Sequence, residues 1–512
     1  SVELSESMLE QGSSPSGGAV FVTDTISFSE GGDYINHFRL ESSEFNTDGA
    51  LTSGGLTVQL REEPADSGEY LGFTVDPSTG AETDIFTLNF NASVKGQYTF
   101  TLLEALDHAD ASGNNILSFD LPVYAVDSDG DESVMNPLQV TIEDDVHLMQ
   151  GGSWTIVEPT LGTPEAESTA TMALFSEQSA DGAIITKIMF GNETRTLDLD
   201  ASGEQAFGFT EGTLYITLEG RMRFEPASDL DHSSGDIVKT IVVTSSDFDN
   251  DAQTTTVTLT ITDGANPIID TVPSVSVSET LLADGSIGGA TPVSSTNTVS
   301  FTEGSDHIDH FRLDTSQFNT DDALTSDGLV AQLREEPVDS GKYLGFTINP
   351  STGAENPVFT LDFDASVKGQ YTFTLLEALD HADANGYNTL SFDLPVYAVD
   401  SDGDESATKP LKVTIADDVP IIDNLASGSE LSVDEKEISG GSQSAGSTSI
   451  AQGWFETTQG ADGVVAYQLT NISNTESGLK SGGLDVTIST VAGNAASTAY
   501  QGVAGNQVIF TL

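Results

Sequence analysis

The sequence predicts an all-β protein built from tandem β-sandwich modules that follow one another in an elongated array. Three observations lead to this prediction: the chain has 512 residues, a long segment of it is duplicated, and short β-rich stretches alternate with turn residues. At about 150 residues per domain, this length corresponds to about three or four modules. Each module is then large enough to bury its own core.

The duplication sets the expected domain organisation. The segment from Phe28 to Val146 aligns without gaps on Phe301 to Val419, and roughly three positions in four are identical. A diverged copy between them carries LDH at 230–232 and DFDND at 247–251, and a further copy opens with LSVDEKEI at 431–438. We therefore expect units at 1–146, 147–266 and 267–419, and a partial unit at 420–512. Because the chain starts and stops inside this pattern, we expect it to be part of a longer protein.

Within a unit the residue pattern predicts strands throughout. In the first copy, the stretches QYTFTLLEAL (97–106), NILSFDLPVYAV (115–126) and PLQVTIEDD (137–145) are rich in β-branched and aromatic residues and are bounded by turn residues. Seven or more such strands in about 120–150 residues predict an antiparallel sandwich of the immunoglobulin or cadherin type. The segment EALDHADA (104–111) is too short to form a stable helix alone.

Charge and composition exclude several classes of function. The chain has 81 acidic and 16 basic side chains, a formal net charge of −65, and no cysteine. Such a chain is repelled by nucleic acid and by anionic lipid, so neither is an expected partner. Disulfides are excluded, and no apolar run approaches the ~18 residues of a membrane-spanning helix, so we expect no membrane insertion in this segment. So large a charge disfavours compaction unless cations are bound or the acids are dispersed.

The first kind of acidic cluster is a loop between two strands. It reads DSDGDES at 127–133 and 400–406, and DFDND at 247–251. Alternate aspartates in a tight turn offer several hard oxygen ligands, which suits Ca²⁺. The spacing is not that of an EF-hand, and a solvated hairpin turn is the alternative interpretation. The predicted calcium ligands are Asp127, Asp129, Asp131, Asp247, Asp249, Asp251, Asp400, Asp402 and Asp404.

Two further kinds of cluster recur in each unit. One follows the last strand, at Asp144, Asp145, Asp263, Asp417 and Asp418. The other is the LDH element, with Asp107, Asp231 and Asp380 as candidate ligands. Its histidines, His108, His232 and His381, are expected to be structural or to support a ligand, because one histidine per unit cannot build a zinc site. Glutamates repeated in the opening strand are weaker candidates: Glu6, Glu158, Glu279 and Glu435.

Strand length predicts how the clusters pair. About ten residues of strand separate Asp107 from Asp127, or ~30 Å, so the two lie at opposite ends of a unit. We therefore expect the acids that end one unit to meet the acidic loop of the next. Asp107, Asp144 and Asp145 should share Ca²⁺ with Asp247, Asp249 and Asp251, and Asp231 and Asp263 with Asp400, Asp402 and Asp404. The remaining clusters, at Asp127–Asp131 and at Asp380, Asp417 and Asp418, should be incompletely coordinated.

These motifs together resemble the tandem repeats of large bacterial surface adhesins exported by type I secretion, the RTX adhesins of biofilms. The carrying features are the E-x-x-L opening, QYTFTLLEALDH, the DSDGDES loop and the TIxDD closing. The resemblance covers nearly the whole chain but is looser in the second unit. It implies extracellular, Ca²⁺-rigidified extender modules, whose partners are neighbouring repeats, while other parts of the parent protein reach a host or abiotic surface.

Two other classes of function compete with a spacer. An enzyme is not expected, because the chain has no nucleophile-elbow, zinc-protease or phosphate-loop motif and its His/Asp element recurs in every unit. A domain that binds glycan or protein is the alternative. Trp154 and Trp454 are more typical of core residues than of a sugar-binding platform.

Overall fold

The computed structural model describes residues 1–512 except for 110–112, 163–170, 181, 290–291, 383–385, 426–430, 439–441, 443–448, 454, 465–466, 468–474 and 492–498. The described residues form two compact units, Ser1–Ala265 and Asn266–Leu512. The fold is all-β, as predicted; the helices of the described residues are short 3₁₀ turns, η1 (Glu6–Met8), η2 (Ser42–Glu44), η3 (Glu279–Leu281), η4 (Thr315–Gln317) and η5 (Glu435–Glu437). No helix in the described part of the chain is long and apolar enough to cross a membrane.

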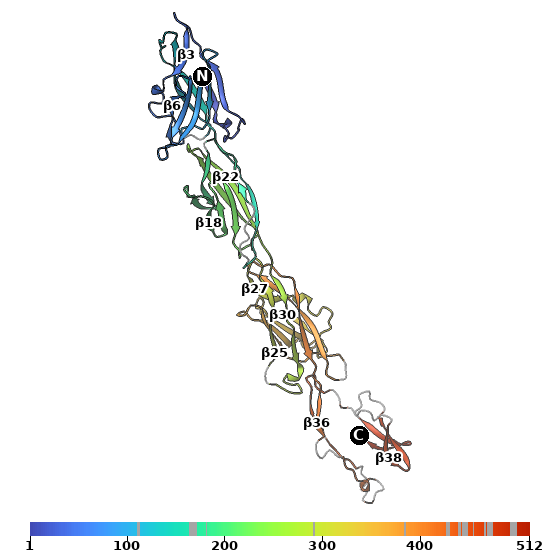
Figure 1. Ribbon diagram of the computed structural model, residues 1–512. Coiled ribbons are helices and arrows are strands. Elements are labelled where there is room, and N and C mark those ends of the chain that lie inside the picture. Colours follow the sequence, from blue (N-terminus) through green and yellow to red (C-terminus); the bar gives the residue numbers. More distant parts are fainter. Residues whose placement is uncertain are drawn as a thin grey trace. The chain divides into compact units, whose positions relative to one another are not determined.

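The first sandwich of the unit Ser1–Ala265 has a four-stranded and a five-stranded sheet (Figure 1). In order across the first sheet, the strands are β1 (Val2–Ser5), β11 (Asn136–Glu143), β10 (Ile116–Asp127) and β3 (Ile35–Leu40). Across the second they are β2 (Val20–Thr25), β9 (Gln97–Leu102), β8 (Glu82–Phe90), β7 (Glu69–Val75) and β6 (Gln59–Glu62). A small hairpin joins β4 (Thr52–Ser53) to β5 (Leu56–Thr57).

The second sandwich follows in the same unit. Its five-stranded sheet comprises β13 (Gly152–Val157), β22 (Ala252–Thr262), β21 (Ile237–Asp247), β16 (Ala183–Phe190) and β17 (Glu193–Thr196). Facing it are β14 (Met172–Ala173), β20 (Arg221–Pro226), β19 (Gly212–Ile216) and β18 (Gln205–Phe209). The short strands β12 (Leu148–Met149) and β15 (Phe175–Glu177) pair beside them.

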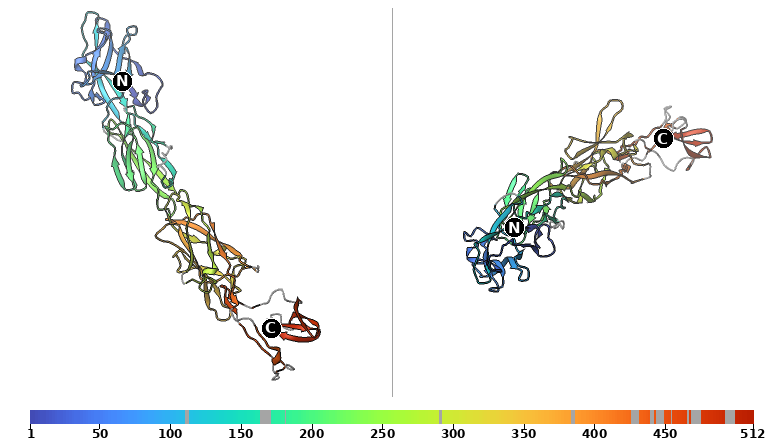
Figure 2. Two further views of the ribbon diagram at one scale, coloured as in Figure 1. Left: turned by 60° about the horizontal axis from the view of Figure 1, so that its bottom comes forward. Right: turned by 90° about the horizontal axis from the view of Figure 1, so that it is seen from above.

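The unit Asn266–Leu512, coloured from yellow-green to red in Figure 2, contains two sheets with the strand order of the first sandwich. One sheet contains β24 (Val275–Ser278), β35 (Lys409–Ala416), β34 (Thr389–Asp400) and β27 (Ile308–Leu313). The other contains β25 (Val293–Thr298), β33 (Gln370–Leu375), β32 (Glu355–Phe363), β31 (Lys342–Ile348) and β30 (Gln332–Glu335). The remaining strands are β23 (Ile268–Thr271), β26 (Ser300–Thr302), β28 (Thr325–Ser326), β29 (Leu329–Val330), β36 (Ile421–Leu425), β37 (Phe455–Thr458), β38 (Thr475–Ser481), β39 (Leu484–Thr490), β40 (Tyr500–Ala504) and β41 (Gln507–Thr511).

The sandwiches differ in one respect from the antiparallel sandwich that the pattern predicts. Strand β1 pairs parallel to β11, with Val2 opposite Val140, and β13 and β24 pair parallel to β22 and β35 in the same way. The opening strand of each sandwich therefore runs alongside its last strand. This pairing carries the glutamate after the opening strand to the same end as the acids after the last strand.

Each sandwich has its own apolar core. Phe86, Phe100 and Phe119 pack against one another in the first, with ring centroids 5.1–6.5 Å apart. The corresponding rings of the third are Phe359, Phe373 and Phe392. Trp154 is buried in the core of the second sandwich, as predicted. Trp454 lies outside the described residues.

A glycine opposite Phe86 is required by this packing. Gly72 on β7 pairs with Phe86 on β8, and a Cβ atom added to Gly72 would lie 2.4 Å from the Phe86 ring. We expect Gly72→Ala to lower the free energy of unfolding by about 1–3 kcal/mol, because the ring must leave its packed position. Gly208→Ala on β18 is the control, because nothing lies within 4 Å of its added Cβ. Equal effects of the two substitutions in urea denaturation would contradict this explanation.

Candidate cation-binding joints

The glutamate after each opening strand is buried at the end of its sandwich. Glu6, in η1, is 1 % exposed, and its Oε1 accepts a hydrogen bond from the Leu106 N–H at 2.8 Å. Glu158 and Glu279 accept the same bond from Leu230 and Leu379, also at 2.8 Å. The parallel pairing of the opening strand thus joins the glutamate to the LDH element. These glutamates, the weakest candidates from sequence, lie at the centre of the acidic groups.

The LDH histidine lies beside that glutamate. The Nε2 atom of His108 is 3.4 Å from Oε1 of Glu6, and His381 has the same relation to Glu279 at 3.3 Å. Burial disfavours the charged imidazolium of His108, but the neighbouring carboxylate of Glu6 outweighs it and raises the pKa of His108 to about 9. The aspartate of the LDH element has a different partner from its histidine: Asp107 accepts a hydrogen bond from the Gly55 N–H at 2.9 Å.

The first acid after the last strand joins the same group. Ligand atoms of Glu6, His108 and Asp144 all lie within 4.8 Å of one another, as do those of Glu279, His381 and Asp417, and those of Glu158, His232 and Asp263. Asp144 is 1 % exposed, and neither of its carboxylate oxygens accepts a hydrogen bond. Burial, together with the charges of Asp249 and Glu6, raises the pKa of Asp144 to about 7.

The acidic loops share one backbone geometry. Oδ1 of the first aspartate accepts the N–H of the aspartate four residues later, at 2.8 Å for Asp127, 2.6 Å for Asp247 and 2.7 Å for Asp400. The loops differ in burial: Asp129 is exposed, whereas Asp249 is 6 % exposed. Burial and the neighbouring Asp249 raise the pKa of Asp247 to about 8, and burial with Asp402 raises that of Asp400 to about 6.

Within the unit Ser1–Ala265, the acids that end the first sandwich meet the acidic loop of the second. The charge of Asp249 acts on both Glu6 and Asp144. The Gly113 N–H of the first sandwich donates to Asp251 Oδ2 at 3.2 Å. His147, in the linker, lies 3.1 Å from Asp247 Oδ2. The structure therefore brings Asp144 close to the loop of Asp247, Asp249 and Asp251, whereas Asp107 is bonded to Gly55. The shared calcium ion stays a prediction.

The chemistry of this joint fits a calcium ion. Among the described residues, six carboxylate oxygens at the joint are buried and accept no hydrogen bond: both of Asp144, both of Asp249, Oδ1 of Asp251 and Oε2 of Glu6. Buried carboxylates without donors or cations are strongly unfavourable. Ca²⁺ takes about six to eight oxygen ligands, and carboxylates are its usual ones. Asp144, Asp249, Asp251 and Glu6 are the residues that would hold it.

Asp145 has a different role from its neighbour Asp144. Its Oδ2 accepts from the N–H of Ser13, at 2.8 Å, and from that of Ala180, at 3.0 Å, and its Oδ1 accepts from the Ser13 hydroxyl at 2.5 Å. Ser13 belongs to the first sandwich, whereas Ala180 precedes β16 of the second and is buried against the core of the first. Asp418 repeats the arrangement with Ser286 and Ala461. Asp145 and Asp418 thus fasten consecutive modules through hydrogen bonds.

Removing this fastening should destabilise the joint. We expect Asp145→Ala to lower the free energy of unfolding of the unit Ser1–Ala265 by about 3 kcal/mol, because bonds to a charged acceptor are lost and two backbone N–H groups are left without an acceptor. The loss should be the same with calcium and with chelator. Asp120→Ala, at an exposed position of β10, is the control and should change little. An Asp145→Ala loss that appears only with calcium would contradict the fastening role.

The remaining predicted ligands have separate surroundings. Asp127 and Asp129 form a group with Asp33. Asp231 accepts from the Ser233 N–H at 3.1 Å, Asp263 from the Gly264 N–H at 2.6 Å and Asp380 from the Gly328 N–H at 2.8 Å. Neither oxygen of Asp402 accepts a hydrogen bond. Asp131 is exposed and Asp404 half-buried. The pairing of Asp231 and Asp263 with Asp400–Asp404 involves both units and stays a prediction.

Sequence reasoning missed two acidic residues of these groups: Asp33, which lies with Asp127 and Asp129, and Asp462. Asp462 lies next to Asp417: burial first, and then the charges of Asp417 and Asp380, raise the pKa of Asp462. It follows Ala461, which Asp418 holds. The available signal is the tripeptide Ala-Asp-Gly, but it occurs at 180–182, 283–285 and 461–463 and so does not single out the joint. Asp181, in the first tripeptide, lies outside the described residues. Glu435, the fourth of the opening glutamates, is exposed.

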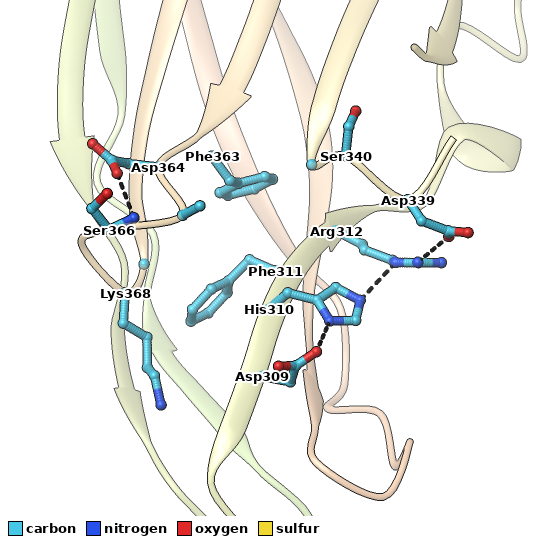
Figure 3. Close-up of a pocket in the computed structure, with 13 residues that line it drawn as sticks. Asp309, His310, Phe311, Arg312, Asp339, Ser340, Phe363, Asp364, Ser366 and Lys368 are labelled. Carbon is cyan, nitrogen blue, oxygen red and sulfur yellow. Dashed lines mark hydrogen bonds and ion pairs between the residues drawn. The ribbon is translucent and has the colours of Figure 1, made fainter. Parts of the chain in front are cut away.

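A cavity of about 610 Å³ on the third sandwich bears on the ligand-binding alternative. Figure 3 shows its side chains: the rings of Phe311 and Phe363 face the cavity beside His310 and Arg312. The polar groups are engaged with one another, since Arg312 Nε donates to His310 Nε2 at 2.8 Å and the guanidinium pairs with Asp339. The polar side chains beside the two rings are thus paired with other groups of the protein.

Comparisons with known proteins find structural likeness only. No protein-family model and no curated protein matches the chain. The mouse clustered protocadherin PcdhgC3 EC1-3 is 12% identical, with 81% of this chain and 99% of that chain covered and a TM-score of 0.20. For protocadherin gamma B7 extracellular cadherin domains 1-4 the identity is 14%, the coverage 99% and 92%, and the TM-score 0.23. For mouse cadherin-23 EC22-24 the values are 14%, 67%, 90% and 0.18. These values are too low to assign a family or a function.

Proposed function

We propose that this chain is a calcium-rigidified extender region of a secreted bacterial surface adhesin, which supports cell adhesion and biofilm formation. The observation that carries the proposal is the joint within Ser1–Ala265, where Asp144 of one sandwich and Asp249 and Asp251 of the next are buried with free carboxylate oxygens. The assignment to the adhesins and the export by type I secretion rest on the sequence resemblance. An extracellular, cell-surface location follows from these two inferences. The proposed task of the chain is to hold its modules in line by binding calcium at their joints, rather than to catalyse a reaction.

Calcium binding would make the alignment of the modules depend on the calcium concentration around the chain. Without the ion, the facing carboxylates repel one another and the joint is loose. With it, binding free energy is added to the aligned state, by about 2.7 kcal/mol for each site when the ion is at 100 times its dissociation constant. Export of a loose chain from a low-calcium cytoplasm and stiffening outside are the proposed consequences. The absence of cysteine fits a set of joints that need no oxidation.

Small-angle scattering of the full chain tests this proposal. We expect a stiff particle in millimolar Ca²⁺ and a broader range of distances after chelation. A chain with Asp144→Asn and Asp249→Asn should respond less to calcium than the natural sequence, because it loses the site at this joint and keeps those predicted elsewhere. Superimposable curves for the natural sequence with and without calcium would contradict the proposal. Saturable binding on a glycan array, abolished by Phe311→Ala, would instead favour the ligand-binding alternative.

A further inference from the structure

We propose that Glu6, His108 and Asp144, and in the third sandwich Glu279, His381 and Asp417, form sites for a first-row transition metal, with imidazole Nε2 as one ligand. This proposal rests on the proposed function in one respect: both require that the joints bind divalent cations. It adds a nitrogen ligand, and hence a second class of metal, to joints that are otherwise lined with oxygen.

The tautomer of His108 is set by Asn115. The side-chain amide of Asn115 donates through Nδ2 to the Ala109 carbonyl at 2.9 Å, so its Oδ1 faces the ring. That oxygen lies 2.8 Å from His108 Nδ1, and because it can only accept, Nδ1 carries a proton. Asn388 holds His381 in the same way, at 3.0 Å to the Ala382 carbonyl and 2.6 Å to Nδ1. An acceptor on one ring nitrogen is the usual support for a histidine that binds metal through the other.

The other ring nitrogen faces carboxylates. The side chains of His108 and Glu6 are 0% and 1% exposed, and Nε2 makes no hydrogen bond of normal length. Oε2 of Glu6 and both oxygens of Asp144 also lack donors. One imidazole and two carboxylates, with ligand atoms within 4.8 Å of one another, suit Mn²⁺ or Co²⁺ better than an all-oxygen group does. The alternative is an ion pair between imidazolium and Glu6 that excludes metal.

The second sandwich supplies an internal control. His232 lies beside Glu158 and Asp263, but its Nδ1 faces the Leu230 carbonyl at 3.2 Å and its Nε2 the Ile261 carbonyl at 3.3 Å. Both ring nitrogens therefore have a carbonyl acceptor, although Nδ1 also lies 3.2 Å from Oε2 of Glu158. The difference from His108 and His381 is that Nε2 of those two residues has no hydrogen-bond partner. The asparagine is also absent, because the position seven residues after His232 is Lys239. The structure assigns the nitrogen-containing site to the first and third sandwiches and not to the second.

Cobalt titration of the full, chelator-stripped chain tests the proposal, with the visible absorption of Co²⁺ as the readout for nitrogen coordination. We expect two equivalents of Co²⁺ to bind with this signature, and His108→Gln with His381→Gln to abolish it. His232→Gln should leave it unchanged. Asn115→Leu with Asn388→Leu should keep the sites but weaken affinity by about 10–100-fold.

Two results would overturn the proposal: a cobalt signature that survives His108→Gln with His381→Gln, or cobalt spectra that show oxygen ligands alone. The calcium function is judged separately, by the calcium-induced rise in melting temperature. That rise should persist in the double histidine variant, because Asp249 and Asp251 are intact. Loss of the rise in the natural chain would contradict the calcium proposal and leave the cobalt result to stand alone.

Discussion

Replacing Asp249 by asparagine is expected to have opposite effects with and without calcium. In chelator the substitution should raise the melting temperature, because it removes a charge that is 6 % exposed and lies among Asp247, Asp251, Asp144 and Glu6. In millimolar calcium it should lower the melting temperature, because the carboxylate that binds the ion is replaced by an amide, which is a weaker ligand. The natural chain should gain about 2.7 kcal/mol per site at 100 times the dissociation constant, and the variant should lose most of that gain.

The first sandwich offers a matched control for this substitution. Asp129 has the same position in its loop as Asp249, but it is exposed. We expect Asp129→Asn to shift the melting temperature little in either condition. Differential scanning calorimetry of the full chain measures both variants. If Asp249→Asn destabilised the protein equally in chelator and in calcium, the acidic cluster would not be a calcium site and the residue would have an ordinary structural role.

Acid should stabilise the calcium-free joint. Burial raises the pKa of Asp144 to about 7 and that of Asp247 to about 8. A carboxyl group whose pKa is higher in the folded state holds its proton there more tightly than in the unfolded chain. Its contribution to stability is complete below the unfolded value of about 4 and is lost as the pH rises through the folded value. The free energy of unfolding should fall by up to about 1.4 kcal/mol per pH unit for each group.

Urea denaturation between about pH 4 and pH 8 measures this slope. Trp154 is buried in the second sandwich and reports on it when Trp454 is replaced by phenylalanine. Saturating calcium should flatten or reverse the slope, since the ion binds only deprotonated carboxylates. Asp144→Asn with Asp247→Asn should flatten it in chelator. A natural chain that grows more stable from acid to neutral pH in chelator would show that these carboxylates are not held among like charges.

Much of the fold could be predicted from sequence because the information is local and repeated. Alternating β-branched residues and the duplication indicate β-sandwiches, and three acidic loops in one register indicate a site. The parallel pairing of β1 with β11 could not be predicted, because it joins residues more than a hundred positions apart. The central place of Glu6 depends on that pairing, and one glutamate per unit forms no acidic cluster in the sequence.

Residues of one type have different roles at the joint, because each role depends on contacts with residues that are distant in the sequence. Asp144 and Asp145 are neighbours with the same side chain, but one has free oxygens and the other is held by Ser13 and Ala180. Only the position of each carboxylate relative to the next module separates the two. Asp462 was overlooked because an aspartate before a glycine is typical of any turn. The histidines were expected to be structural; the asparagine seven residues later gains meaning only from the contact with Nδ1.

A crystal structure of the full chain grown with calcium tests the central claim most directly. Anomalous difference density should show an ion bounded by Asp144 and Glu6 of the first sandwich and by Asp249 and Asp251 of the second. The ion would then be shared by two modules. Density confined to the loop Asp247–Asp251, or carboxylates of the two sandwiches turned apart around water alone, would contradict a calcium-bridged joint.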